Sequence, residues 1–515
     1  PPLPSSPHAD PTLTETATTG RHLGLLSSLM LILSRVIGSG IFAMPGTILQ
    51  SVGSPLLSLL LWLAGAFIAW FALSIDLEYG CMLPRSGGMK VYLEYTFPEP
   101  RWGAATVVAV HVVLLGFTAS NCVVFAKYVL FVAGDGGEVR DWVVKGVAVG
   151  LMTGITLVHG VAYRTGVVVQ NVLGWVKIGL VVFMIGTGGV VVVMRGFGVG
   201  PREEGVGGAR MGMGVGTEGW WDGADWSYNT LATALFKISY SYAGLNNINN
   251  VLNEVKDPVR TLRTIPPFAL VASCLLYLLI NLAYLAVVPM EEVKQSRELI
   301  AALFFQRVFG DGFGSKFLPI AIALSAAGNV MVVTFSLARI NQEVARAGLI
   351  PFSSYLSSSR PFNSPLGGLI VHYIPSVLVI ILPPSKTVYA FIAEVEGYSS
   401  QFFAVALGVG LLILRKRKPD LVRPFRAWTP LVWLRLGICG ILIFAPLFSP
   451  KKKERESGGI FYAAYALVAL SVLVFSVAYW YVWTRLLPWL GGYRWEEETS
   501  TLKDGTTITT LVRKK

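Results

Sequence analysis

The sequence predicts an all-α membrane protein with about twelve transmembrane helices, and two observations carry this prediction. Of its 515 residues, 53% are hydrophobic and only 14% are charged, whereas a typical soluble domain has about 25% charged residues. The hydrophobic residues also come in blocks of roughly 20, the length that an α-helix needs to cross about 30 Å of hydrocarbon. Because backbone groups inside lipid must be hydrogen bonded within their own segment, these blocks are expected to be helices.

The expected domain order is simple. Residues 1–22 are rich in Pro, Ser and Thr and are expected to form a disordered tail. Residues 23–484 are expected to form a single transmembrane domain, and residues 485–515 a polar cytoplasmic tail. The expected spans are residues 25–50, 56–83, 103–133, 142–160, 167–194, 227–252, 265–289, 317–345, 367–383, 386–414, 429–448 and 459–484.

Basic residues in the short loops predict the orientation. An even number of spans places both termini on one side, and most loops on that side carry lysine and arginine, which favours a cytoplasmic location. These basic residues are Arg85, Lys90, Arg164, Lys256, Arg260, Arg263, Arg339, Arg346 and the cluster from Arg415 to Arg426. The tract KKKERE at 451–456 falls outside in this scheme, although its acidic residues dilute the charge. We therefore expect a multi-pass protein of the plasma membrane, and the net charge of +12 does not indicate nucleic-acid binding.

Two segments between the spans are expected to lie outside the cell. The Gly-rich, polar segment 195–226 is interpreted as an external loop. It is not a phosphate-binding loop, because no strand precedes it and no GKS or GKT follows it. The segment 292–310 is too polar to span the membrane and is expected to form a short external helix.

The first span contains Gly38, Ser39 and Gly40 near its middle. Glycine in a helix interior costs roughly 1 kcal/mol relative to alanine, so this sequence favours unwinding of the helix. Unwound backbone at this depth is tolerated only where it lines a cavity or is buried in protein. The motif alone leaves a second interpretation open, a close contact between helices packed through small residues.

The sixth span contains Tyr242, Ala243 and Gly244 at its middle, followed by several asparagines such as Asn246. Asparagine facing lipid would be costly, so this half of the span is expected to face protein or water. Interrupted helices at matching places in two halves of a chain are the best sequence indication of a transporter site between inverted repeats. The two interruptions, five spans apart, therefore predict a binding site.

Unwound helices have a definite chemistry. The N–H groups freed at the start of the outer half of the first span, together with the positive end of the helix dipole, would bind a carboxylate. The carbonyl groups freed near Tyr240, Ser241 and Tyr242 would bind an ammonium group. Such a site would recognise an α-amino acid without any charged side chain.

Four motifs carry a family resemblance. They are RVIGSGIF at 35–42, PRSGGMKVYLEYTF at 84–97, NVLGWVKIG at 171–179 and NEVKDPVRTL at 253–262. With these motifs the chain resembles the amino acid–polyamine–organocation superfamily, in particular its L-type amino-acid transporter branch and the fungal high-affinity methionine permeases. The resemblance extends over about residues 22–484. It implies a LeuT-type fold of five plus five inverted helices with two additional helices, discontinuous helices 1 and 6, and alternating access.

The resemblance also implies which residues bind substrate. The expected carboxylate site is formed by Ile37, Gly38, Ser39 and Gly40, and the amine and side-chain pocket by Tyr240, Tyr242, Ala243 and Gly244. Two positions depart from the L-type pattern: Ala243 stands where glycine is usual, and Leu245 where an aromatic gate is common. Both departures affect the expected size and shape of the side-chain pocket.

Further residues are candidates for coupling or gating. Lys177 lies within the fifth span, where an ionisable residue is a functional candidate by default. In similar transporters a lysine at this place takes the position of a sodium ion, so it could couple transport to protons or act as a static cation that ties the fifth span to the first. Arg35, Asn246 and Glu254 lie beside the two interruptions. For Arg35 and Glu254 an inner gate and separate roles in capping or snorkelling remain alternatives.

Three other polar residues receive a first interpretation. Asp76 and Glu78, at the inner end of the second span, are expected to be structural. Asn329 in the eighth span could form a packing hydrogen bond or line the pathway.

The function predicted from the sequence is secondary active transport of methionine or another neutral L-amino acid into the cell, coupled to protons. The alternatives are a non-transporting amino-acid sensor and an exchanger of neutral amino acids. We expect no enzyme activity, cofactor or metal site, since no nucleophile–base pair or metal-ligand cluster stands out. We also expect no disulfide-linked partner subunit, because the expected external loop at 134–141 contains no cysteine.

Overall fold

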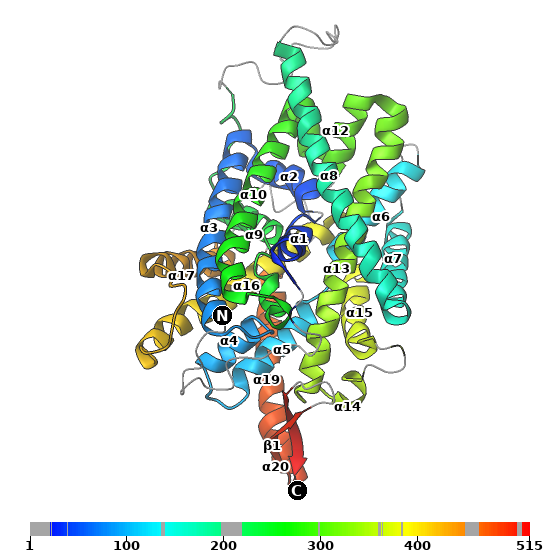
Figure 1. The fold of residues 1–515 in the computed structure, drawn as a ribbon. Helices are drawn as coiled ribbons and strands as arrows, with labels where there is room; N and C mark the ends of the chain where they lie inside the picture. The colour runs from blue at the N-terminus through cyan, green and yellow to red at the C-terminus, as the bar shows by residue number, and fades with distance from the viewer. Residues whose placement is uncertain are drawn as a thin grey trace.

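The computed structural model describes residues 21, 23–38, 40–134, 140–196, 219–296, 299–358, 362, 364–382, 385–448, 463–501 and 507–514. Helices dominate this part of the chain (Figure 1). They are α1 (Leu25–Val36), α2 (Gly40–Val52), α3 (Pro55–Met82), α4 (Met89–Thr96), α5 (Gly103–Leu115), α6 (Ala119–Ala133), α7 (Asp141–Val161), α8 (Tyr163–Gly196), α9 (Tyr228–Ser241), α10 (Pro258–Val287), α11 (Met290–Ser296), α12 (Ile300–Phe309), α13 (Leu318–Arg346), α14 (Ser353–Leu356), α15 (Leu366–Ile381), α16 (Ser385–Arg417), α17 (Thr429–Phe444), α19 (Ala464–Tyr481) and α20 (Leu487–Gly491). Short 3₁₀ segments cover Asn247–Asn250, Leu252–Glu254 and Ala445–Leu447, and π-helical segments cover Gly310–Phe317 and Val482–Leu486.

Ten helical stretches in the described residues are long and apolar enough to cross a membrane. Each of the twelve expected spans has a helical counterpart, and two of them fall outside these ten for local reasons. The sixth span is divided after Ser241, and the ninth, α15, has only 16 residues. The all-α membrane fold expected from the sequence is therefore confirmed, including the interruption of the first and sixth spans.

Two long helices begin at sequence signals of the expected kind. The hydroxyl of Ser54 accepts a hydrogen bond from the Leu57 amide (3.3 Å) immediately before Pro55 opens α3. The carboxylate of Asp257 accepts one from the Arg260 amide (3.3 Å) before Pro258 opens α10. A capping side chain followed by proline at the first helical position satisfies free amides and presets the backbone angle.

The centre of the bundle is the first span. Figure 1 shows α1 in the middle of the view, with α3, α9 and α10 on one side and α8 and α13 on the other. One large buried apolar cluster joins α1, α2, α3, α9 and α10, and α10 packs against both α3 and α8. The broken helices are thus enclosed by continuous ones.

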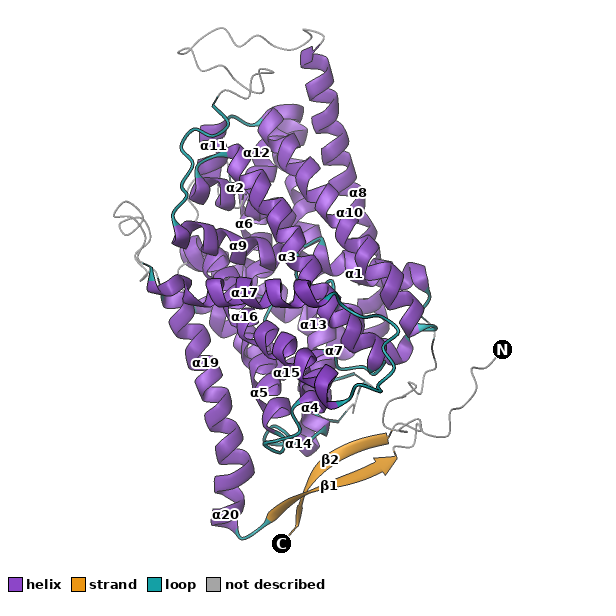
Figure 2. Cartoon of the chain, turned by 90° about the vertical axis from the view of Figure 1, so that its left-hand side faces the viewer, coloured by secondary structure: helices purple, strands orange, loops and turns teal. Residues whose placement is uncertain are grey.

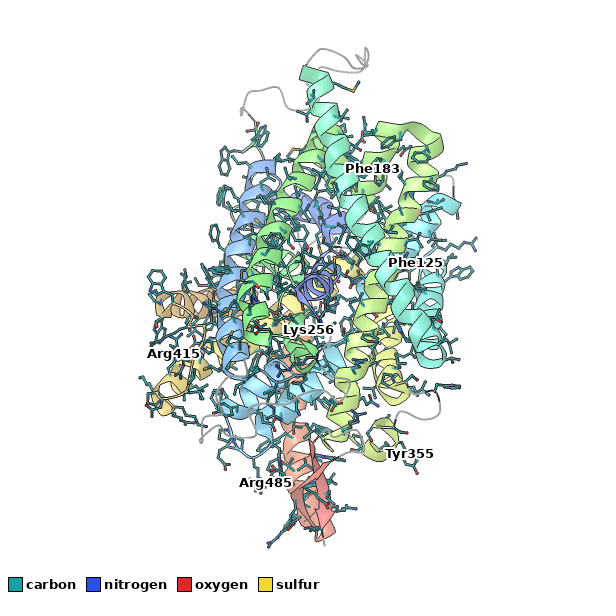
Figure 3. All side chains as sticks on the ribbon, in the orientation of Figure 1. Phe125, Phe183, Lys256, Tyr355, Arg415 and Arg485 are labelled. Carbon is teal, nitrogen blue, oxygen red and sulfur yellow. The ribbon has the colours of Figure 1, made fainter. Side chains whose placement is uncertain are left out.

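The segment 292–310 forms short helices, as expected, rather than a span. α11 and α12 pack against α2, the outer half of the first span. Phe309 of α12 also stacks on Phe183 of α8, with ring centroids 5.6 Å apart (Figure 3 labels Phe183). Most of the loop 195–226, namely residues 197–218, and the tract 451–456 lie outside the described residues, as do residues 1–20 and 22 of the N-terminal tail.

The third span contains an interruption that the sequence analysis did not predict. α5 ends at Leu115 and α6 begins at Ala119, and His372 of α15 lies beside the gap. The Nδ1 atom of His372 is 2.8 Å from the carbonyl oxygen of Gly116, so Nδ1 carries a proton and donates it. Its Nε2 lies 3.3 Å from the hydroxyls of Thr118 and Thr334. A side chain from another helix therefore compensates for the lost helical hydrogen bonding.

A β-hairpin follows the last span, where the sequence analysis expected only a polar tail. Strands β1 (Arg494–Thr501) and β2 (Thr507–Lys514) pair antiparallel, with Arg494 opposite Lys514 (Figure 2). The hairpin is anchored to helix ends: the Trp102 indole donates to the Glu497 carboxylate (2.6 Å), and the Leu511 amide donates to the Ala347 carbonyl (3.3 Å).

Glu78 is fully buried and holds the inner ends of two spans together. Its carboxylate receives two hydrogen bonds from the Arg415 guanidinium and one from the Ala427 amide (2.7 Å), and it lies 3.4 Å from Nε of Arg423. These contacts agree with the structural role expected for Glu78, because they fix α3 to the end of α16 and the segment after it.

Candidate functional site

The first span is interrupted between Val36 and Gly40. The Gly38 amide donates to the Val36 carbonyl (2.9 Å), which turns the chain out of the helical path. A Cβ atom on Gly40 would lie 2.9 Å from Oγ of Ser241, at the end of α9. Glycine at position 40 therefore allows the two interrupted spans to touch. Ser39, the middle residue of the motif, lies outside the described residues.

The sixth span is interrupted directly after Ser241. Gly244 has a φ of +108°, a conformation that residues with a side chain rarely adopt. A Cβ atom there would lie 2.2 Å from Cγ of Arg35, so the arginine stem passes directly across the glycine. Beyond it the chain continues in 3₁₀ turns rather than as an α-helix.

Side chains from continuous helices bind the carbonyl groups at the end of α1. The Lys177 ammonium of α8 donates to the Ser34 carbonyl (2.9 Å), and Lys177 is fully buried. The Asn329 amide of α13 donates to the Arg35 carbonyl (3.2 Å). Lys177 therefore does tie the fifth span to the first, and Asn329 forms a packing hydrogen bond.

Tyr277 of α10 connects the two interruptions. Its hydroxyl lies 2.9 Å from the Val36 carbonyl oxygen and 2.6 Å from the Ser241 carbonyl oxygen. Its ring packs edge-on against Trp62 and Tyr242, with centroids 5.1 and 5.0 Å away. The hydroxyl proton of this one buried phenol can therefore be donated to the last carbonyl group of either α1 or α9.

A cavity lies between the interruptions and occupies about 450 Å³, including the space at its mouth. All three interrupted spans contribute to it, together with α13 and α16. Its lining residues are Arg35, Val36, Gly38, Gly40, Phe117, Thr118, Asn121, Tyr240, Ser241, Ala243, Asn329 and Glu396. The two predicted interruptions therefore do enclose one common space.

The expected substrate residues divide into two groups. Gly38, Gly40, Tyr240 and Ala243 line the cavity. Ile37, Tyr242 and Gly244 are not part of the described lining.

The three residues outside the lining have other surroundings. Ile37 is fully buried, and the Tyr242 hydroxyl turns away to the Trp62 carbonyl (3.3 Å). Gly244 contacts the Arg35 stem instead. The Tyr242 ring packs in the aromatic cluster with Trp62 and Tyr277, and its expected role in the substrate pocket stays a prediction.

Glu396 of α16 is the main residue that the sequence analysis missed. The sequence argument expected recognition without charged side chains, but Arg35 and Glu396 both line the cavity. Acidic residues inside an apolar span are a usable signal, and the tenth span contains Glu394 and Glu396. Glu394 is not part of the described lining and instead forms an ion pair with Lys237 of α9 (3.3 Å).

The remaining gating candidates, Asn246 and Glu254, belong to the unwound part of the sixth span. The Asn246 amide donates to the Asp76 carboxylate (3.1 Å), so Asp76 contacts the unwound part of the sixth span rather than serving only its own helix. Glu254 ends the last 3₁₀ turn, and its side chain lies outside the described part of the structure. An Arg35–Glu254 gate therefore stays a prediction.

No group of three His, Cys, Asp or Glu side chains in the described part of the chain could hold a metal ion. The arrangement as a whole is a polar, enclosed space with unwound backbone on two sides.

Comparison with known proteins agrees with this geometry. Residues 23–488 match the family described as amino acid permease. The chain belongs to the amino acid permease family. It is a multi-pass membrane protein of a family whose members carry amino acids across membranes.

Three relatives within this family show which transporters the chain is similar to. The permease is 32% identical over 497 residues to the low-affinity methionine permease of Saccharomyces cerevisiae, covering 96% of this chain and 88% of the relative. It is 33% identical over 482 residues to the high-affinity methionine permease of the same yeast, covering 92% and 81%. It is also 27% identical over 478 residues to a b(0,+)-type amino acid transporter of Mus musculus, covering 91% and 90%. The resemblance to fungal methionine permeases and the L-type branch is confirmed.

Proposed function

We propose that this permease is a secondary active transporter that imports methionine or another neutral L-amino acid by alternating access, coupled to protons. The observation that carries the proposal is the single cavity bounded by both interrupted spans. A site at which unwound backbone from two helices meets is the arrangement expected for a carrier with one occluded substrate position. The similarity to two yeast methionine permeases supports methionine as the first substrate to test.

The carboxylate of the substrate is proposed to bind at Ile37, Gly38, Ser39 and Gly40. The first amides of an α-helix have no partner within the helix, and the positive end of the helix dipole favours an anion at the start of α2. Gly38 and Gly40 line the cavity, which supports this position.

The substrate side chain is proposed to lie beside Tyr240 and Ala243, which also line the cavity. The Tyr240 hydroxyl is bonded to Ser120 (2.6 Å), which fixes the direction of its ring. Tyr242 and Gly244 are proposed to shape the pocket from behind, through the aromatic cluster and the Arg35 stem.

Lys177 is proposed to couple transport to protons. Its ammonium holds the Ser34 carbonyl at the end of α1, and lysine can lose its proton when it is buried. Loss of that proton would weaken the contact between α8 and the first span, which links protonation to movement of the interrupted helix. Asn246 and Glu254 are proposed to act in inner gating, Asn246 through Asp76.

The permease is proposed to reside in the plasma membrane with both termini in the cytoplasm, and to function without enzyme activity, cofactor or disulfide-linked subunit. In this orientation residues 1–22 and 485–515 are cytoplasmic extensions of one transport domain. The basic loops on that side support the orientation.

Uptake of labelled methionine into proteoliposomes, with and without an inward proton gradient, tests the proposal. We expect accumulation above equilibrium only with the gradient. Counterflow of labelled methionine without any gradient separates a carrier from a sensor, since a sensor would bind but show no counterflow. Accumulation driven by internal amino acid instead of protons would identify an exchanger and overturn proton coupling.

A further inference from the structure

Two charged side chains of opposite sign face the cavity from different helices. Arg35 comes from the end of α1 and Glu396 from the middle of α16, and each attracts the other electrostatically. Among the described residues, neither the guanidinium of Arg35 nor the carboxylate of Glu396 takes part in a hydrogen bond or an ion pair. Charges enclosed at mid-membrane depth are costly unless they are paired, so this arrangement needs an explanation.

The position of Arg35 is fixed by the second interruption. Its stem crosses Gly244, where no Cβ atom blocks the path. The Lys177 and Asn329 side chains hold the Ser34 and Arg35 carbonyls. The Arg35 stem therefore lies against Gly244, and the side chain lines the cavity.

Two of the three carbonyl groups that were expected to bind the ammonium group already accept a hydrogen bond from the protein. The Ser241 carbonyl accepts from the Tyr277 hydroxyl (2.6 Å), and the Tyr240 carbonyl accepts from the Ala243 amide (3.1 Å). The Glu396 side chain faces the cavity, and no donor among the described residues is bonded to its carboxyl group. Hydrogen bonds to an ionised acceptor are roughly twice as strong as those to a neutral one.

Two lysines in the described part of the chain, Lys237 and Lys177, have partners other than Glu396. Lys237 is paired with Glu394, and Lys177 with the Ser34 carbonyl. The other polar groups of the wall, such as Tyr240 and Asn121, are neutral and bonded to each other (3.4 Å).

We propose that the Glu396 carboxylate receives the α-ammonium group of the substrate, with Arg35 supplying the balancing positive charge while the cavity is empty. The inference rests on the proposed transport of amino acids and specifies the group that selects them. A zwitterion brings its own cation to Glu396 and its own anion to the side of Arg35 and the first interruption, so both enclosed charges are satisfied at once.

The test compares two ligands on purified protein. Methionine and 4-(methylthio)butanoate differ only in the amino group, and their ratio of dissociation constants measures how strongly that group is recognised. Glu396→Gln keeps the size of the side chain but removes its charge. We expect the ratio to fall by about 30-fold or more in this variant, the range found when one partner of an enclosed charge pair is truncated.

Two further variants make the result specific. Glu396→Asp keeps the charge and should retain most of the preference for methionine. Glu394→Gln removes an acid two residues away on the same helix and should leave the ratio unchanged, whatever it does to the rate of uptake. If Glu396→Gln weakens both ligands equally, or if Glu394→Gln lowers the ratio as much, the assignment is overturned.

The wild-type protein separates this inference from the proposed function. If it binds no neutral amino acid, the proposed function fails and the assignment with it. If it binds methionine and the ratio survives Glu396→Gln, amino-acid transport stands and only the role of Glu396 is rejected. If Glu396→Gln does not fold, Glu396→Asp and the wild-type ratio decide: a wild-type preference under about tenfold contradicts recognition of the ammonium group by a carboxylate.

Discussion

The backbone amide of Lys256 donates a hydrogen bond to the carbonyl oxygen of Leu23, at 3.0 Å. Leu23 also forms an isolated parallel bridge with Val255. These contacts join the inner end of the first span to the inner end of the sixth, and Lys256 marks this place in Figure 3. From these contacts we predict that the start of the first span and the end of the sixth move as one unit.

Two cysteine pairs test this unit. Leu23→Cys with Val255→Cys joins segments that are proposed to move together, so oxidation should leave methionine uptake intact. Ser34→Cys with Gly174→Cys joins α1 to α8, and a Cβ atom on Gly174 would lie 3.9 Å from that of Ser34, a distance suited to a disulfide. Oxidation of this second pair should stop uptake, and a reductant should restore it.

The crosslinks are best made without Cys274, the only one of the four native cysteines that is not buried. Equal inhibition by both disulfides would contradict the common movement of the first and sixth spans. Uptake that survives the Ser34–Gly174 disulfide would show that α1 does not move against α8.

Replacing Lys177 separates coupling from a static role. Lys177→Met removes the donor to the Ser34 carbonyl while keeping an apolar stem of similar length. We expect gradient-driven accumulation to be lost while methionine counterflow persists. Lys145→Met, which breaks a surface pair with Asp141 (2.8 Å), is the control and should keep both activities. Loss of accumulation and counterflow together would favour a purely structural lysine.

Tyr277→Phe should weaken the centre of the bundle. It removes a hydroxyl that lies within hydrogen-bond distance of both the Val36 and Ser241 carbonyl groups, and a buried polar group without a partner costs about 1–3 kcal/mol. We expect a lower melting temperature in detergent and a weaker affinity for methionine. Tyr284→Phe on the same helix loses only a long bond to the Ile41 carbonyl (3.4 Å) and should change both quantities less. An equal effect of the two substitutions would argue against a special role of Tyr277.

Side chains added at the two interruptions should abolish uptake. Gly40→Val places atoms within 2.9 Å of the Ser241 hydroxyl, and Gly244→Ala places a methyl group 2.2 Å from the Arg35 stem at a φ that alanine rarely adopts. Gly186→Ala in α8 is the control, since a Cβ atom there has no neighbour within 4 Å. Normal uptake by Gly40→Val or Gly244→Ala would count against the site between the interruptions.

Glu78→Gln should destabilise the protein without involving the cavity. Removing the charge leaves the guanidinium groups of Arg415 and Arg423 without their buried partner, a loss of about 3–5 kcal/mol in the free energy of unfolding. Glu343→Gln, at an exposed pair with Arg346, should cost less than about 1 kcal/mol. Denaturant titration of the two variants in detergent measures the difference, and similar stabilities would show that Glu78 is not a central contact.

The sequence allowed the order of the spans and the interruptions of the first and sixth spans to be predicted, because these features depend on local composition. Apolar blocks of spanning length determine the helices, and Gly38, Gly40 and Gly244 weaken two of them at mid-membrane depth. The contact of Lys177 with the first span was one of two alternatives that the sequence left open, and it followed from the family resemblance.

The rest depends on partners that are distant in the sequence. The gap after Leu115 is stabilised by His372, which lies 256 residues beyond Gly116. The residues near Gly116 therefore did not allow the gap to be predicted. Tyr242 turns away from the cavity because Trp62 and Tyr277 enclose its ring. Glu396 could have been noticed as an acid inside a span, but its place opposite Arg35 follows only from how α16 packs beside the broken helices.

The C-terminal hairpin offers a fixed reference for measurements of movement. Its contacts at Trp102 and Ala347 are with the ends of α5 and α13, not with the first or sixth span. A spin label on β2 should therefore keep its distance to α13 throughout the transport cycle, while its distance to a second label at Leu23 should change. Pulsed electron spin resonance on such pairs would report the tilt of the interrupted helices directly, with the hairpin as the fixed reference position.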